Sequence, residues 1–112
     1  IDAVELGSAA FRAALGGAAL AVNATTVGML DAGLSLDIEA LPDDATIFDL
    51  VYVPPETLLL QSARERGMRA ANGSEMLIAQ AAIAFERWTG VGGMAPVMRD
   101  AVTPLLAAGG PA

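Results

Sequence analysis

The stretch Thr46-Ile-Phe-Asp-Leu-Val-Tyr-Val-Pro-Pro-Glu-Thr57 decides the fold. Its first part is rich in β-branched and aromatic side chains, which predicts a strand over residues 46–52. Pro54 and Pro55 cannot continue a central strand, because proline has no backbone N–H to donate. Thr57 suits a helix N-cap, so we expect a helix over residues 58–66. A strand followed directly by a helix is typical of an α/β fold.

The residues before this stretch predict a second such unit. Ser8 can cap a short helix over residues 9–15, which the glycine pair at 16–17 would end. The apolar run at 18–23 ends in polar residues, as a buried parallel strand does. Residues 33–44 carry glycine, proline and acidic side chains without periodicity, and we expect them to be irregular.

The residues after it predict a third strand and two further helices. Residues 69–72 are a short extended segment, and Ser74 can cap a long helix that ends near Trp88. Pro96 suits the first turn of a last helix, which Pro104 should kink or break. The alternation of strands and helices predicts a mostly parallel sheet.

In parallel sheets of this kind, ligands bind beyond the carboxyl ends of the strands. Three loops should leave the predicted strands there, over residues 23–28, 52–55 and 72–74. All of them carry polar residues or glycine. The sequence therefore predicts that any ligand site lies at this edge.

Composition excludes several classes of function. Of the 112 residues 54% are hydrophobic, and the mean hydropathy is +0.53, so we expect another layer or domain to cover part of the surface. The net charge is −7 without a basic patch, which argues against nucleic acid as a partner. Without Cys or His, a zinc or haem site is not expected, and we expect a cytoplasmic protein that does not bind a membrane. Because the first residue is Ile, we expect a piece of a longer chain that, in isolation, folds poorly or self-associates.

Gln80 is the polar exception in the apolar run from Met76 to Phe85. A helix that is apolar all round is usually buried, and a buried amide needs a hydrogen-bonding partner. A hydroxylated ligand would supply that partner, and so would a backbone carbonyl of a neighbouring element.

Tyr52 and Gly73 each allow a structural and a functional interpretation. Tyr52 either caps the sheet edge with its hydroxyl in water or directs that hydroxyl at a substrate oxygen. Gly73 either forms a tight turn with positive φ or lets a ligand approach its backbone closely. The Asn-x-Ser/Thr patterns at 23–25 and 72–74 are interpreted as chance matches to a glycosylation motif, and Asp43-Asp44 as solvated carboxylates, not a metal site.

Four motifs together resemble the C-terminal part of the shikimate dehydrogenase family. They are Asn23-Ala-Thr-Thr-Val-Gly-Met29, Asp49-Leu-Val-Tyr-Val-Pro54 with Thr57-Leu-Leu59, Gly73-Ser-Glu-Met-Leu-Ile-Ala-Gln80, and Phe85-Glu-Arg-Trp-Thr-Gly90. They occur in the family's order and at its spacing. The resemblance implies an enzyme of aromatic amino-acid (chorismate) biosynthesis, which reversibly reduces 3-dehydroshikimate to shikimate with NADPH.

The resemblance also implies a domain organisation. Residues 1–90 would be the second half of a Rossmann-like three-layer cofactor-binding domain with a mostly parallel sheet, including the long helix 74–89. Residues 91–112 would be a C-terminal linker and helix. The N-terminal substrate domain would be the missing partner, and a homodimer is the expected assembly.

Site residues follow from the same resemblance. Tyr52 and Gln80 correspond to substrate-binding positions. The cofactor-binding positions would be Asn23, Ala24, Thr25, Leu50, Gly73 and Met76, with Gly73 contacting the nicotinamide amide through its backbone and Met76 lining the pocket of that ring.

The chain departs from the family in ways that leave alternatives open. The family's catalytic Lys and Asp lie in the substrate domain, and this chain has no lysine, so no catalytic residue is assigned and the chain alone should be inactive. The Gly-rich phosphate loop is also missing, and Val53 replaces a common asparagine. A quinate/shikimate dehydrogenase that prefers NAD, and a non-catalytic α/β module that binds a nucleotide or a partner, therefore remain as rivals.

Overall fold

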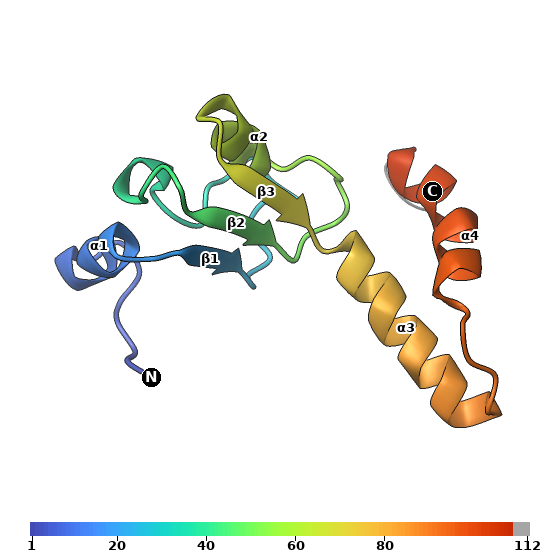
Figure 1. Cartoon of the computed structure of the whole chain (residues 1–112). Coiled ribbons are helices and arrows are strands. Elements are labelled where there is room, and N and C mark those ends of the chain that lie inside the picture. Colours follow the sequence, from blue (N-terminus) through green and yellow to red (C-terminus); the bar gives the residue numbers. More distant parts are fainter. Residues whose placement is uncertain (109–112) are drawn as a thin grey trace.

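The computed structural model describes residues 1–108 as helices around a parallel sheet of three strands (Figure 1). The strands, in the spatial order β1-β2-β3, are β1 (Leu20–Asn23), β2 (Thr46–Asp49) and β3 (Arg69–Asn72). The helices are α1 (Ala9–Gly16), the 3₁₀ helix η1 (Ile38–Ala40), α2 (Leu58–Glu65), α3 (Ser74–Thr89) and α4 (Ala95–Ala107). The predicted α/β class and the parallel sheet are confirmed.

The hydrophobic core lies on one face of the sheet. Ala21 of β1 and Ile47 of β2 are buried there against α1, η1 and α2, which contribute Leu15, Ile38 and Leu60. On the opposite face Leu20 and Val22 are about half exposed. Two layers are therefore present within residues 1–108, and the second face of the sheet is left largely uncovered.

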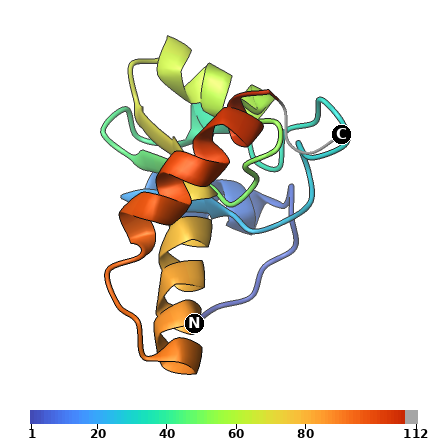
Figure 2. The same ribbon diagram turned by 90° about the vertical axis from the view of Figure 1, so that its right-hand side faces the viewer.

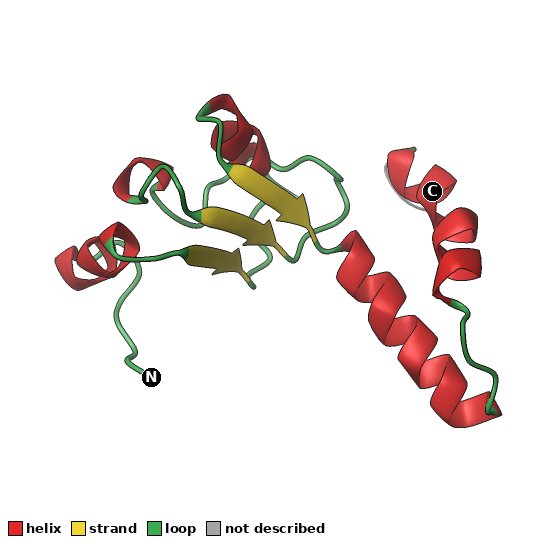
Figure 3. Ribbon diagram, in the orientation of Figure 1, coloured by secondary structure: helices red, strands yellow, loops and turns green. Residues whose placement is uncertain are grey.

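Two strands are shorter than the sequence predicts, for local reasons (Figure 3). The first begins at Leu20 because the N–H of Ala18 still bonds to the carbonyl of Leu15 at 3.1 Å. The second ends at Asp49 because the N–H of Val51 turns back to the Asp49 carboxylate at 3.0 Å. A polar side chain that bonds to the backbone two residues on offers the chain an alternative to the ladder.

One prediction about a helix end is wrong, and of the kink or break expected at Pro104 the break does not occur. Gly73, not Ser74, is the N-cap of α3, because the Ser74 hydroxyl bonds to the Asn72 side chain at 2.6 Å instead of capping the helix. The last helix does not break at Pro104 but continues to Ala107. Proline has no N–H, so Pro104 cannot donate the helical hydrogen bond to the carbonyl of Asp100. Both residues are exposed, and water can donate to that carbonyl instead.

Helices α3 and α4 form a hairpin that projects from the end of β3, away from the sheet (Figures 1 and 2). The radius of gyration is 16.1 Å, compared with about 13 Å for a compact domain of this length. Ile78 is the buried residue of α3, and Gln80 is exposed. The prediction of a buried amide is wrong within residues 1–108. Among the described elements, mainly α4 packs against this helix, and it leaves Gln80 uncovered.

An ion pair joins the two helices of this hairpin. The Arg99 guanidinium donates to both oxygens of the Glu75 carboxylate, at 2.8 and 2.7 Å. These hydrogen bonds hold the pKa of Glu75 below its ordinary value, and the positive charge of Arg99 acts in the same direction. Because the folded pKa is lowered, the pairing stabilises the hairpin above the ordinary pKa of Glu75, and this contribution is lost as the pH falls through the lowered one.

Arg99→Gln should raise the pKa of Glu75 toward its ordinary value, because it removes both the hydrogen bonds and the charge. An NMR titration of the Glu75 side-chain carboxyl carbon measures the change. Arg87→Gln, on α3 itself, is the control, since Arg87 has no ion pair among residues 1–108. Equal titration curves in the two variants would contradict the prediction.

The described residues contain neither a membrane-spanning helix nor a cluster of metal ligands. No helix within residues 1–108 has the length and hydropathy needed to cross a membrane. The same residues contain no group of three or more acidic, His or Cys side chains arranged to hold a metal ion.

Candidate functional site

The last residues of the three strands form one polar row across the sheet. Asn23, Asp49 and Asn72 are register partners, and their side chains point to the covered face. Asn23 and Asp49 are buried, at 2% and 0% exposure, and Asn72 is half-buried. Because the strands are parallel, the three loops leave one edge of the sheet, as the sequence predicts.

Asn23 organises the loop that follows β1. Its side-chain oxygen accepts from the N–H and the hydroxyl of Thr25, at 3.1 and 2.6 Å. Its amide nitrogen donates to the Val27 carbonyl at 3.1 Å and to Asp49 at 2.9 Å. The Asn23 side chain is thus fully occupied within the protein, and it shapes the loop while Ala24 and Thr25 are exposed.

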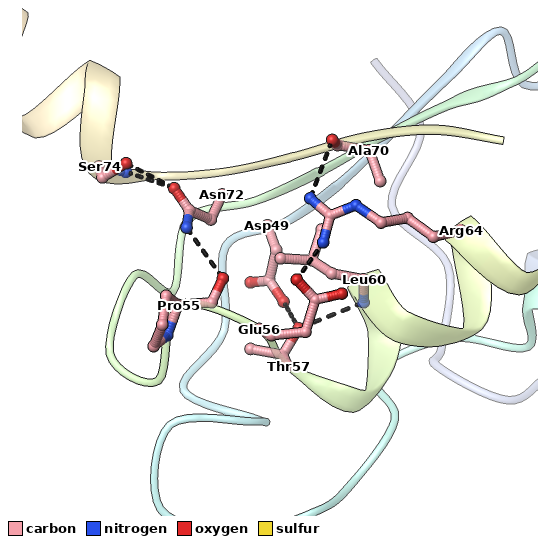
Figure 4. Close-up of polar contacts among 9 residues, drawn as sticks. All are labelled: Asp49, Pro55, Glu56, Thr57, Leu60, Arg64, Ala70, Asn72 and Ser74. Atoms are coloured by element: carbon pink, nitrogen blue, oxygen red, sulfur yellow. Dashed lines mark hydrogen bonds and ion pairs between the residues drawn. The ribbon is translucent and has the colours of Figure 1, made fainter. Parts of the chain in front are cut away.

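The same local motif recurs after β3 (Figure 4). The Asn72 oxygen accepts from the N–H and the hydroxyl of Ser74 at 3.1 and 2.6 Å, and its amide donates to the Pro55 carbonyl at 2.9 Å. The two Asn-x-Ser/Thr patterns are therefore turns that fix the loops, which explains why they stand directly after strands. Their repetition was the sequence signal for this shared role.

Asp49 is a central residue that sequence reasoning missed. Its Oδ1 accepts from Asn23 and from the N–H of Val51, and its Oδ2 accepts from the Thr57 hydroxyl at 2.6 Å (Figure 4). The Thr57 hydroxyl in turn accepts from the N–H of Leu60 at 3.3 Å, which confirms Thr57 as the cap of α2. An acidic residue within an apolar strand was the available signal, because a buried carboxylate needs such partners.

Gly73 brings the start of α3 against the end of β2. A Cβ on Gly73 would lie 2.2 Å from the carbonyl oxygen of Leu50 and 2.8 Å from its carbonyl carbon. Its φ is −80°, so the expected turn with positive φ is wrong. The close approach is made by the Leu50 backbone, which joins Leu50 and the first turn of α3, including the partly exposed Met76, in one region.

Tyr52 and Gln80 lie in different surroundings. Tyr52 is half-buried in the loop after β2 and lines a shallow depression with Met29, Leu30 and Val53. Gln80 is exposed, and its side chain has no hydrogen bond to any residue in the described range 1–108. It stands about 10 Å along the axis of α3 from Gly73, at 1.5 Å per residue. The other predicted positions thus lie at or next to the carboxyl edge of the sheet, whereas Gln80 lies further along α3 and is exposed to solvent.

Comparison with known proteins identifies the family of this chain. Residues 73–103 match the sequence model of the shikimate 5'-dehydrogenase C-terminal domain. A curated shikimate dehydrogenase (NADP(+)) of Rhodopseudomonas palustris strain HaA2 is 57% identical over 79 residues, which cover 70% of this chain and 28% of the relative. The chain belongs to the shikimate dehydrogenase family. It corresponds to the C-terminal part of the family's proteins.

Solved structures confirm the fold of this shikimate dehydrogenase region as Rossmann-like. Shikimate 5-dehydrogenase of Thermus thermophilus, in complex with NADP(H) and shikimate, superposes with a TM-score of 0.76 at 35% identity, over 83% of this chain and 36% of that one. Quinate dehydrogenase of Corynebacterium glutamicum, in complex with NAD, gives a TM-score of 0.78 at 35% identity, over 85% and 34%. The chain thus spans about a third of the length of these proteins.

Membership in the shikimate dehydrogenase family makes the polar row a candidate part of a ligand site. The loops fixed by Asn23, Asp49 and Asn72 lie at the carboxyl edge of a parallel sheet, where folds of this type bind their ligands. This edge is therefore the candidate functional site within residues 1–108.

Proposed function

We propose that the complete protein is a shikimate dehydrogenase that reversibly reduces 3-dehydroshikimate to shikimate with NADPH, and that this chain supplies one wall of the site. The observation that carries the proposal is the contact of Gly73 with the Leu50 backbone. It sets the first turn of α3 against the end of β2 and leaves no room for a side chain between them. A site that orients a flat cofactor ring needs such fixed backbone positions.

The residues present fit a nicotinamide cofactor. Leu50, Gly73 and Met76 form the region that would face the nicotinamide, and the loop over residues 23–25 would border the ribose and diphosphate. The bound cofactor would supply the hydride. Gly73 is buried, and its carbonyl already accepts from the N–H of Leu77 at 3.0 Å, so a nicotinamide amide would have to use the second lone pair of that oxygen. Leu50 and Met76 offer apolar surface that excludes water.

Tyr52 and Gln80 would hold the substrate. Tyr52 can direct its hydroxyl at a substrate oxygen from the loop after β2. Gln80 is exposed, and its side-chain amide has no hydrogen-bonding partner within residues 1–108. In the complete protein we expect this amide to meet the hydroxyl groups of shikimate. Gln80 is the polar exception in the apolar run from Met76 to Phe85 of α3, and this favours a partner outside residues 1–108.

The rest of the protein follows from this assignment. Residues 1–90 would be the second half of the cofactor domain, and an N-terminal substrate domain would carry the catalytic groups. The linker and helix expected over residues 91–112 are described only to residue 108, and residues 109–112 lie outside the described range. We place the enzyme in the cytoplasm, with which the absence of cysteine agrees, and expect a homodimer.

Turnover of four substrate and cofactor pairs by the complete protein tests the function. We expect NADP⁺ reduction with shikimate to exceed that with quinate, and NADP⁺ to exceed NAD⁺. The likeness to an NAD-bound quinate dehydrogenase makes the reverse preference the second candidate. Binding of either nucleotide without turnover of any pair would favour a non-catalytic module.

Gln80→Ala in the complete enzyme should raise the KM for shikimate or lower kcat about tenfold, because one good hydrogen bond to a substrate is worth roughly 1–1.5 kcal/mol. The Kd for NADP⁺ should change little. Steady-state kinetics and isothermal titration measure these effects. Gln61→Ala, another exposed helical glutamine, is the matched control. Equal kinetics in both variants would remove Gln80 from the site.

A further inference from the structure

Asp49 joins three segments of the chain through hydrogen bonds. Its carboxylate is fully buried, and it accepts hydrogen bonds from Asn23 at the end of β1, from Val51 in the loop after β2, and from Thr57 at the start of α2. No other buried carboxylate is found within residues 1–108. Every partner lies in, or directly next to, a loop at the carboxyl edge of the sheet.

The role of Asp49 differs from that of the apolar core residues. A buried carboxylate is costly to desolvate, and a core of similar shape built from apolar residues is often equally stable. Ile47, two residues earlier on the same face of β2, provides that apolar packing. The hydrogen bonds of Asp49 go instead to the loop that contains Asn23 and Thr25 and to the segment that contains Leu50 and Tyr52.

A second contact joins the loop after β1 to the start of α2. Gly28 has a φ of +94°, and a Cβ there would lie 3.3 Å from the Thr57 methyl group. The end of the loop over residues 23–28 therefore packs directly on the residue that Asp49 holds. The loop and the start of α2 cannot shift independently while the Asp49–Thr57 bond is intact.

We propose that Asp49 is a positioning residue: by bonding Asn23, Val51 and Thr57 at once, it holds the loop that borders the cofactor and the loop that carries Tyr52 in a single geometry. Asp49 itself contacts neither ligand. This inference rests on the proposed function for its effect on turnover, and on the observed hydrogen bonds alone for its effect on the loops.

Asp49→Asn in the complete protein tests the proposal. The asparagine keeps an oxygen for Asn23 and Val51 but offers Thr57 an NH₂ in place of an acceptor. We expect hydrogen exchange at the amides of Thr25 and Val51 to become at least about tenfold faster, and kcat with shikimate and NADP⁺ to fall at least about tenfold, since small misplacements of reacting groups cost up to about 100-fold.

Ile47→Val is the matched control. It removes one methyl group from the same strand and the same buried face, so it should lower the Tm while kcat and the exchange of both amides stay as in the unmodified protein. If Asp49→Asn lowers the Tm but matches Ile47→Val in kcat and in exchange, the positioning role is overturned.

The remaining outcomes also decide the question. If the unmodified protein does not turn over shikimate, the proposed function fails, while the exchange rates still show whether Asp49 couples the two loops. If Asp49→Asn does not fold, Thr57→Val and Thr57→Ser replace it. The valine variant should lose turnover with faster exchange, and the serine variant, which keeps the hydroxyl, should restore both; equal behaviour of the two would overturn the proposal.

Discussion

Gly73→Ala is expected to lower the free energy of unfolding by about 3 kcal/mol, the upper part of the usual range for overpacking. The added Cβ would lie 2.2 Å from the Leu50 carbonyl oxygen, and its next neighbours at 2.8 and 3.0 Å are also backbone atoms of Leu50. No side chain can rotate away to relieve the overlap, so the end of β2 and the start of α3 must separate. Urea unfolding of the complete protein measures the loss.

The same substitution should weaken the proposed cofactor site. Separation of Leu50 from Gly73 displaces the two positions that would flank the nicotinamide, so we expect the Kd for NADP⁺ to rise at least about tenfold. Gly17→Ala is the control, because a Cβ there meets nothing within 4 Å and its φ of −108° suits alanine. Its stability should stay within about 0.5 kcal/mol of the unmodified protein. Similar losses in both variants would show that the Leu50 contact is unimportant.

Leu60→Ala should cost about 3 kcal/mol of stability, because it removes a large side chain from the centre of the core and leaves a cavity. Leu60 is 0% exposed and packs between α2 and the covered face of the sheet, in the cluster that includes Ile47. The loss should appear in the urea unfolding midpoint without a change in the slope of the transition.

Leu58→Ala provides a control on the same helix. Leu58 is 38% exposed, so the same truncation removes less buried surface and should cost less than half as much. Both variants replace leucine by alanine in the same helix, and the two positions differ in how much of the side chain is buried. If the two variants lose equal stability, the covered face of the sheet is not the core that the structure shows.

The fold class was predictable because its signals are local. β-branched runs, Thr57 as a cap and glycine after a helix act within a few residues, and the structure confirms the resulting elements. Errors about the elements lay at ends such as Ser74, where a side chain had two local partners to choose from, and in the segment 33–44, which was expected to be irregular but contains η1. The parallel sheet and the position of the loops then follow from the order of strands and helices.

The candidate site was predictable only in part. Four motifs identified the family and the positions to examine, and the structure places Asn23, Leu50, Tyr52 and Gly73 at one edge of the sheet. The exposure of Gln80 was not predictable from its apolar neighbours, because burial depends on what packs against a helix. In residues 1–108 that is mainly α4.

The sequence by itself determined the elements, their order and the family. Only the tertiary structure decided the use of the polar residues that bond across the strands. Asp49 and Asn23 stand 26 positions apart, so their hydrogen bond exists only once β1 and β2 are paired. Gly73 is required by the carbonyl of Leu50 rather than by its own φ, and no local pattern encodes that contact. The physical reason is that hydrogen bonds and steric overlap act over a few ångströms in space, whatever the separation in the chain.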